Sequence, residues 1–300
     1  MSSYDVVRHF KRNLPQGFGK IGHFGTLDPF ACGTLMIGIG GAARLNDFIH
    51  EYLPKTYLAV GKLGIETPTG DYTSEISQKD ESLYLNREIA NFPKAFINER
   101  VKEKFIGDYW QPPHKYSAAK FMGKNLHEWA REGVEVKKEA VLRKVYAIEV
   151  VKYQFPYLVV RVTVSSGTYV RTLFSDIAQD LGTLGSLVSL VRESVGHVKA
   201  SEGIYKKNWP HERGIEILKR GKRVDDVLHF PKNILDPEQV RAFKNGAFLR
   251  PFGEGEYVWI LDEKDTLLGL AHKVSEHELR PKINFHSEAL TQLSSDHDPQ

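Results

Sequence analysis

The stretch AVLRKVYAIEVVKYQF (140–155), followed by Pro156 and then by YLVVRVTVSS (157–166), is the part of the sequence that decides the fold. Both runs are rich in valine and other β-branched or aromatic residues, which favour strands. The proline between them is typical of a turn. These residues predict two long consecutive strands, and hence a fold built on a β-sheet.

The segments on either side show both strand-like and helix-like patterns. Continuous apolar runs predict further strands at 34–40 and 55–65, and a final apolar run spans residues 184–196. Apolar residues at helical spacing predict helices at 3–13, 41–53, 86–98 and 168–182. Because strands and helices do not alternate strictly, we expect an α+β fold with a central mixed or antiparallel sheet flanked by helices.

The character of the sequence changes near residues 226–236, where Pro231 and Pro237 bracket a linker. Beyond it, short strand-like runs at 256–262 and 266–274 are separated by glycine and charged turns. We therefore expect a main domain over 1–228 and a small β-rich domain over 232–285. The polar residues 286–300 are expected to be disordered.

Composition excludes several classes of protein. The chain has 41% hydrophobic residues and no run of 18 apolar residues, so no membrane span is expected. A single cysteine, Cys32, excludes an internal disulfide framework and fits a reducing cytosol. The 12 histidines form no metal-binding motif. We expect a cytoplasmic protein that uses no metal and no redox cofactor.

The charge is unevenly distributed. Residues 231–300 carry 8 Lys and Arg against 12 Asp and Glu, whereas residues 1–230 carry 33 against 26. The larger part is therefore basic and could hold an RNA backbone. A solvated surface with a chance imbalance explains the charge alone equally well.

Two further patterns have simpler explanations than the chemistry they suggest. GIGGAAR (38–44) fits G-x-G-x-x-A, but no acidic residue follows about 20 positions later, as dinucleotide binding requires. Its glycines are expected to allow close packing. Cys32 has no evident basic partner, so we expect a small buried side chain and not a nucleophile.

The segment GHFGTLDPFACGTL (22–35) holds the main candidate for chemistry. Its glycines permit a tight loop close to a ligand. Pro29 restricts Asp28 to extended backbone and removes one competing N–H donor. An Asp on such a loop is a candidate nucleophile or electrostatic stabiliser, although an isolated Asp-Pro pair is more often an ordinary turn.

The same segment resembles the catalytic motif of the TruB family of bacterial tRNA pseudouridine(55) synthases, G-H-x-G-x-L-D-P-x-A-x-G-x-L, at every fixed position. The resemblance extends from residue 3 to about residue 285 and includes a C-terminal domain similar to the family's PUA-like RNA-binding module. Further segments match in the family's order: Lys55-Thr56-Tyr57, Gln111-Pro112-Pro113, Tyr116-Ser117-Ala118 with Lys120, Gly123, Ala130-Arg131-Glu132-Gly133, Ser166-Gly167-Thr168-Tyr169-Val170-Arg171, and Leu190 with Arg192.

The resemblance implies a pseudouridine-synthase fold. It also implies an enzyme that isomerises uridine to pseudouridine at position 55, in the T-loop of tRNA. The base is flipped out of the loop, its glycosidic bond is broken with help from a carboxylate, and the base is rejoined through C5. By resemblance the catalytic residues are Asp28, Arg171 and Tyr57. Arg171 would form a bidentate ion pair that orients Asp28, and Tyr57 would stack on the flipped base.

Six further residues are implied in substrate binding. His23 would fill the space that the base leaves, and Tyr169 and Leu190 would line the pocket. Candidate phosphate contacts, for which a solvated basic face is the alternative, are Lys120, Lys124 and Arg131.

The implied partner is the T-arm of tRNA, with no guide RNA, no membrane and no obligate protein partner. A rival interpretation is a non-catalytic tRNA-binding or tRNA-folding chaperone on the same scaffold, but such a protein would not need Asp28. Family members usually begin with a strand and a Lys-Pro-x-Gly element. This sequence starts at Met1-Ser2-Ser3, so we expect that strand to be missing and a sheet edge to be exposed.

Overall fold

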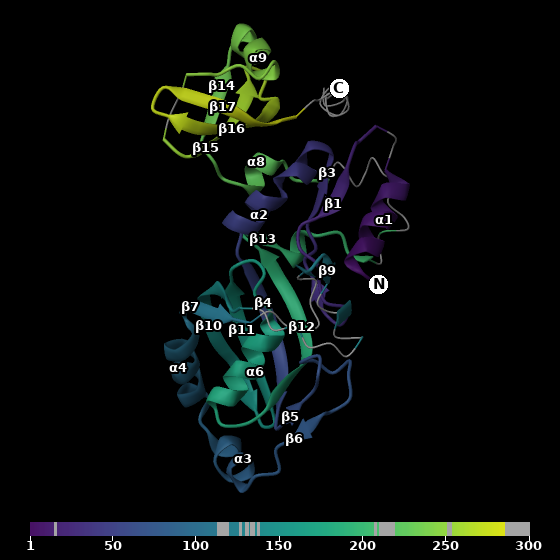
Figure 1. Cartoon of the computed structure of the whole chain (residues 1–300), viewed down its shortest axis with the longest axis vertical. Coiled ribbons are helices and arrows are strands. Elements are labelled where there is room, and N and C mark those ends of the chain that lie inside the picture. Colours follow the sequence, from purple (N-terminus) through teal and green to yellow (C-terminus); the bar gives the residue numbers. More distant parts are fainter. Residues whose placement is uncertain are drawn as a thin grey trace, which may run out of the picture. The chain divides into compact units, whose positions relative to one another are not determined.

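The computed structural model describes residues 1–14, 17–112, 120–125, 128–129, 132, 136, 139–206, 209, 220–250 and 254–285. The chain forms two compact units (Figure 1). The first comprises residues 1–26, 35–52 and 204–300, and the second comprises residues 27–34 and 53–203. The tail predicted to be disordered, residues 286–300, lies outside the described residues.

Among the described residues, a seven-stranded sheet forms the centre of the second unit (Figure 1). Six strands follow one another in antiparallel pairs, and the seventh, β2, pairs with β12 in parallel, so the sheet is mixed, as predicted. In spatial order the strands are β13 (Val198–Lys199), β12 (Gly185–Val195), β4 (Lys55–Leu63), β11 (Tyr157–Val164), β10 (Val141–Gln154) and β7 (Gly107–Gln111), with β2 (Cys32–Gly33) beside β12.

Two helices, α4 (Lys94–Phe105) and α6 (Val170–Asp180), pack on one face of this sheet. Alternate residues of β4 and β11 are buried, as expected for strands with one covered face. Close approach of α6 depends on Gly61, because a Cβ there would lie 2.0 Å from Phe174 Cζ. The first turn of α6 carries Arg171, so this packing also fixes a predicted site residue.

The helix predicted over 86–98 is wrong. A short helix α3 (Leu83–Arg87) and a 3-10 turn η2 (Ile89–Asn91) end before Pro93, and α4 begins only at Lys94. Pro93 has extended backbone and caps α4, since a proline suits a helix start and not its interior. The remaining small elements of this unit are β5 (Ile65–Glu66), β6 (Gln78–Lys79), β8 (Lys120–Phe121), β9 (Lys124–Asn125) and η3 (Ala200–Glu202).

The first unit contains helix α1 (Ser3–Asn13), which starts with a capping box between Ser2 and Asp5. A four-stranded sheet in the order β14–β15–β16–β17 forms its β-rich part, with Trp259 fully buried. The other elements of this unit are β1 (Ile21–His23), β3 (Ile37–Ile39), η1 (Gly40–Leu45), α2 (Asn46–Tyr52), α8 (Val224–Val227), α9 (Pro237–Lys244), β14 (Lys232–Leu235), β15 (Tyr257–Asp262), β16 (Leu267–Ser275) and β17 (Glu278–Asn284).

The glycines of GIGGAAR serve packing. A Cβ at Gly38 would lie 2.3 Å from the ring of Phe24, and a Cβ at Gly41 would lie 2.3 Å from the ring of Phe285. The segment enters a 3-10 helix and not an α-helix, so the predicted helix 41–53 is α-helical only from Asn46. No helix within the described residues is both long and apolar enough to cross a membrane.

Candidate active site

The loop that carries Asp28 is tied to the end of strand β12. The backbone N–H of Thr34 donates to the carbonyl of Arg192 (2.8 Å), and Arg192 Nε donates to the carbonyl of Thr34 (2.7 Å). Gly33 has a φ of +106°, and a Cβ there would lie 2.3 Å from the Arg192 oxygen, so only glycine fits. The Asp28 backbone is thus anchored a few residues from β12.

Arg171 holds the Asp28 carboxylate with two nitrogen atoms. Nη2 donates to Asp28 Oδ1 at 3.0 Å, and Nε lies 3.0 Å from Oδ2. The Arg171 side chain is only 5% exposed, whereas that of Asp28 is 32% exposed. The expected ion pair is therefore present, with one hydrogen bond from Nη2 and a close contact from Nε, and with the arginine buried and the carboxylate partly open to solvent.

Asp71 is a second carboxylate at this site, and sequence reasoning missed it. Its Oδ2 lies 3.4 Å from Arg171 Nη1, while the same nitrogen donates to the carbonyl of Thr69 at 2.7 Å. The Asp71 side chain is buried and is held through Oδ1 by Thr69 and Thr73. Arg171 thus lies between two carboxylates: Nη2 and Nε face Asp28, and Nη1 contacts the buried Asp71.

The environment shifts the ionisation of Asp28. Burial raises the pKa of Asp28 above its ordinary value near 3.8, Arg171 opposes that shift, and the negative charge of Asp71 adds to it. Arg192 lowers the pKa to a smaller extent. The site therefore keeps a partly desolvated carboxylate whose charge depends on its arginine partner.

Tyr57 lies in β4, opposite Arg192 of β12 and Val162 of β11. It is 9% exposed and belongs to the same apolar cluster as Leu190, which pairs with Ala59. Phe30 packs against this cluster, and its ring meets that of Tyr72 edge to face. These aromatic contacts link the Asp28 loop to the sheet and to the segment that carries Asp71.

The other predicted binding residues are placed as follows. Tyr169 is the N-cap residue of α6. His23 lies in the first unit, in β1, opposite Ile37 of β3. Lys120 and Lys124 belong to the hairpin β8–β9. The side chains of both lysines, and Arg131 as a whole, lie outside the part of the chain that the structure describes.

Cys32 corrects a prediction, because it is exposed and not buried. It lies in the two-residue strand β2, both of whose residues are exposed. In the described part of the chain, no three His, Cys, Asp or Glu side chains are grouped so that they could hold a metal ion.

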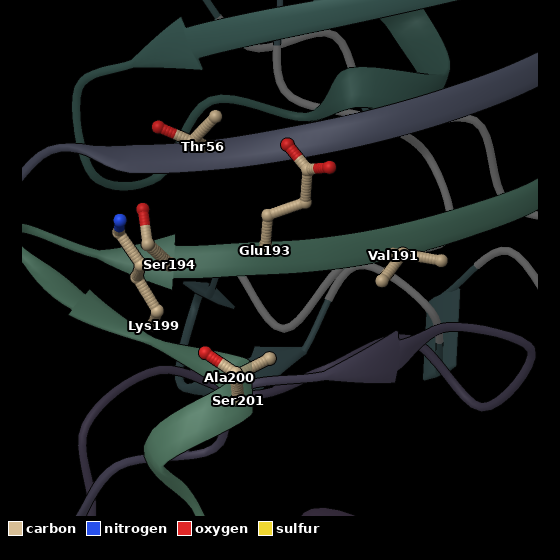
Figure 2. Close-up of a pocket in the computed structure, with 7 residues that line it drawn as sticks. All are labelled: Thr56, Val191, Glu193, Ser194, Lys199, Ala200 and Ser201. Carbon is tan, nitrogen blue, oxygen red and sulfur yellow. The ribbon is translucent and has the colours of Figure 1, made fainter.

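A hollow of about 440 Å³ lies beside strands β4, β12 and β13 (Figure 2). It includes Thr56, which precedes Tyr57 in β4 and so points to the opposite face. The remaining lining residues come from β12, β13 and η3, and none of the predicted site residues is among them. They are Val191, Glu193, Ser194, Lys199, Ala200 and Ser201.

Comparison with known proteins supports the family that the Asp28 segment resembles. A family model described as TruB family pseudouridylate synthase (N terminal domain) matches residues 11–170, more than half of the chain. The chain belongs to the TruB family. The matched residues include Asp28, Tyr57 and Asp71 and end just before Arg171.

Relatives in the TruB family cover most of the chain. It is 34% identical over 251 residues to tRNA pseudouridine synthase B of Clostridium kluyveri, covering 83% of this chain and 82% of that protein. It is also 34% identical over 279 residues to the protein of the same name from Thermotoga maritima, with coverage of 90% and 85%.

Solved structures show the same fold. A chain in the crystal structure of a Cbf5–Nop10–Gar1 complex aligns with a TM-score of 0.65 and 24% identity, covering 95% of this chain and 82% of that chain. A chain of an H/ACA RNP bound to a substrate RNA containing 2'-deoxyuridine aligns with a TM-score of 0.63 and 23% identity, covering 96% and 83%. The TruB-family chain therefore has the pseudouridine-synthase fold that was predicted.

Proposed function

We propose that this protein isomerises uridine to pseudouridine at position 55, in the T-loop of tRNA. The observation that carries the proposal is the ion pair between Asp28 and the buried Arg171 in a chain that belongs to the TruB family. The choice of tRNA is supported by the relatives, which are named tRNA pseudouridine synthase B.

Asp28 is proposed as the catalytic carboxylate. When the bond between N1 of the base and C1′ of the ribose breaks, the base leaves with the electron pair and C1′ becomes electron-deficient. An ionised carboxylate beside C1′ can stabilise or trap this centre, as in glycoside cleavage. The base then turns and C5 bonds to C1′, and where the carboxylate has trapped C1′ that C–O bond breaks and the carboxylate is released. The proton on C5 leaves, and N1 gains a proton.

Arg171 is proposed to keep Asp28 ionised and aimed while the site closes over the substrate. The hydrogen bond from Nη2 to Oδ1 and the close approach of Nε to Oδ2, both at 3.0 Å, orient the carboxylate. They also oppose the effect of burial, which raises the pKa of Asp28. Asp71 in turn prevents Arg171 from turning away, since it holds the other side of the guanidinium.

The uridine must leave its stacked position before it can reach Asp28. Extruding a nucleotide costs a few kcal/mol. Stacking on an aromatic ring returns about 1–3 kcal/mol, and Tyr57 is proposed for that contact. His23, Tyr169, Leu190, Lys120, Lys124 and Arg131 are proposed as further substrate contacts.

We further propose that the protein acts in the cytoplasm on the T-arm of tRNA, without a guide RNA or an obligate protein partner. In this proposal residues 1–228 form the catalytic domain and residues 232–285 a PUA-like RNA-binding domain. A purely non-catalytic tRNA binder is disfavoured, because binding does not require a carboxylate held by a buried arginine.

The test is to incubate the protein with an unmodified tRNA transcript and to map pseudouridine at single-nucleotide resolution. We expect conversion at the T-loop uridine alone, without added metal or cofactor. A protein that binds the transcript and converts no uridine would support the tRNA-binding alternative instead.

A further inference from the structure

Gln111 is a buried residue of the Gln-Pro-Pro motif to which the catalytic scheme gives no role. It is the last residue of β7 and is 2% exposed. Its amide grips both backbone groups of one residue: the N–H of Tyr169 donates to Oε1 at 2.8 Å, and Nε2 donates to the carbonyl of Tyr169 at 3.0 Å. The following Pro112 favours extended backbone at Gln111, which suits the end of a strand.

Tyr169 is the N-cap residue of α6, and its side chain makes no capping hydrogen bond. Helices normally satisfy their first N–H groups with a polar side chain at this position. Here the cap residue is instead held by a side chain 58 positions away in sequence. Arg171 follows two residues later in the first turn of α6, so the position of Tyr169 determines where the Arg171 side chain leaves the helix.

A second group extends this contact along the helix. Gln111 Nε2 also donates to the hydroxyl oxygen of Tyr109 at 3.3 Å, and the Tyr109 hydroxyl donates to the carboxylate of Asp176. Burial, together with the Asp176 carboxylate, raises the pKa of Tyr109 well above its ordinary range, so this hydroxyl stays protonated and can donate. Asp176 lies further along α6, so β7 holds the helix at two points.

We propose that Gln111 is a positioning residue for the reaction: by holding both backbone groups of Tyr169 it sets the first turn of α6 and so aims Arg171 at Asp28. The inference concerns the same site as the proposed function and takes its kinetic readout from it. Gln111 does not touch the reacting atoms in this scheme. It acts through Tyr169 and Arg171.

The test compares Gln111→Ala and Gln111→Glu with the wild type. Single-turnover rates and tRNA affinities are measured from pH 5 to pH 9. For Gln111→Ala we expect the rate to fall about 10- to 100-fold, because small misplacements of catalytic groups have effects of that size. We expect the affinity for tRNA to stay within about threefold, because RNA affinity comes mainly from phosphate contacts, which Gln111 does not make in this scheme.

The pH dependence separates positioning from a loss of folding. Among the described residues, the charged groups that act on Asp28 are Arg171, Asp71 and Arg192. If only Arg171 moves away, the pKa of Asp28 must rise, so the acid limb of the rate profile shifts to higher pH in Gln111→Ala. In Gln111→Glu, an ionised carboxylate cannot donate to the Tyr169 carbonyl, but a protonated carboxyl can. The rate of Gln111→Glu, relative to the wild-type rate at the same pH, should therefore recover as the pH falls.

The matched control is Asn98→Ala. Asn98 on α4 accepts a hydrogen bond from the backbone N–H of Val150 at 2.9 Å, so this variant also loses a link between a side chain and the backbone in the same unit. We expect it to keep the wild-type rate and pH profile. The inference would be overturned if Asn98→Ala lost as much rate as Gln111→Ala. It would also be overturned if Gln111→Ala had the rate of the wild type and the same fall in rate at acidic pH.

A readout without RNA keeps the inference testable if the proposed function fails. The pKa of Asp28 is measured by carboxyl ¹³C NMR titration of the free protein, with Asp28→Asn used for assignment. We expect a higher pKa for Asp28 in Gln111→Ala than in wild type. An unchanged pKa overturns the role of Gln111, whereas an inactive wild type with the expected change in pKa overturns only the proposed function.

Discussion

Replacing Asp71 by Asn tests whether the buried carboxylate behind Arg171 contributes to catalysis. The amide oxygen can keep the hydrogen bonds that Oδ1 accepts from Thr69 and Thr73. The amide nitrogen would then face Arg171 Nη1 at the 3.4 Å position, where two donors oppose each other. The variant therefore removes one contact of the guanidinium and leaves the surrounding turn intact.

The expected size follows from the geometry. A hydrogen bond to a charged group contributes about 1.5–3 kcal/mol, and at 3.4 Å the lower end applies. If that loss appears in the transition state, the rate falls about tenfold. Arg171 stays beside Asp28 in this variant, because Nη1 still donates to the Thr69 carbonyl at 2.7 Å. The negative charge of Asp71 raises the pKa of Asp28, so its removal should also move the acid limb of the rate profile to lower pH.

The assay is single-turnover pseudouridine formation on a tRNA transcript across pH 4.5–8. Asp80→Asn is the control, since Asp80 accepts hydrogen bonds from Ser82 and Thr183 in the same unit and has no role in the catalytic scheme. We expect the control to match wild type. If Asp71→Asn keeps the maximal rate of the wild type, and its rate falls at the same acidic pH, the proposed role of Asp71 is refuted.

Further expectations concern folding and RNA binding. Burial, and then the charge of Arg192, lower the pKa of Lys55 from 10.5 to about 8, so the unfolded chain binds more protons between these pH values and stability rises with pH across that window. Lys55→Met should lack this rise. The free energy of unfolding of the wild type, measured with urea, should therefore gain about 3 kcal/mol over that of Lys55→Met between pH 8 and pH 10.5. Free energies of unfolding that change with pH by the same amount in both proteins would contradict this expectation. Gly61→Ala should lower the free energy of unfolding by about 1–3 kcal/mol or more through its clash with Phe174, and an unchanged urea midpoint would argue against this packing. The affinity for tRNA should fall steeply between 50 and about 200 mM salt, and a flat response would count against phosphate contacts.

Most of the sheet could be predicted from local sequence. The runs 140–155 and 157–166 became β10 and β11, and 55–65 became β4, because each run is rich in the β-branched and aromatic residues that favour strands. The apolar run 184–196 contains β12, where the family resemblance placed a strand at Leu190 and Arg192. The helix over 168–182 was also found, as α6. Periodicity failed at 86–98, where apolar spacing continued through Pro93 although the backbone could not.

The partners of the site residues could not be predicted in the same way. Asp71 and Arg171 lie 100 positions apart, and Gln111 and Tyr169 lie 58 apart, so no local pattern signals either contact. Asp71 lies in a polar loop that resembles any other turn. Asp28 and Arg171, 143 positions apart, were paired only because their motifs resemble those of a known family. The contacts of Asp71 and Gln111 had no such signal and became visible only in the structure.

The central claim is that the Asp28 carboxylate carries the chemistry. The most direct measurement is pseudouridine formation at the T-loop uridine by Asp28→Asn, with tRNA affinity measured on the same preparation. We expect no detectable conversion and an affinity within a few-fold of wild type. Conversion by Asp28→Asn at a rate close to that of wild type would contradict it.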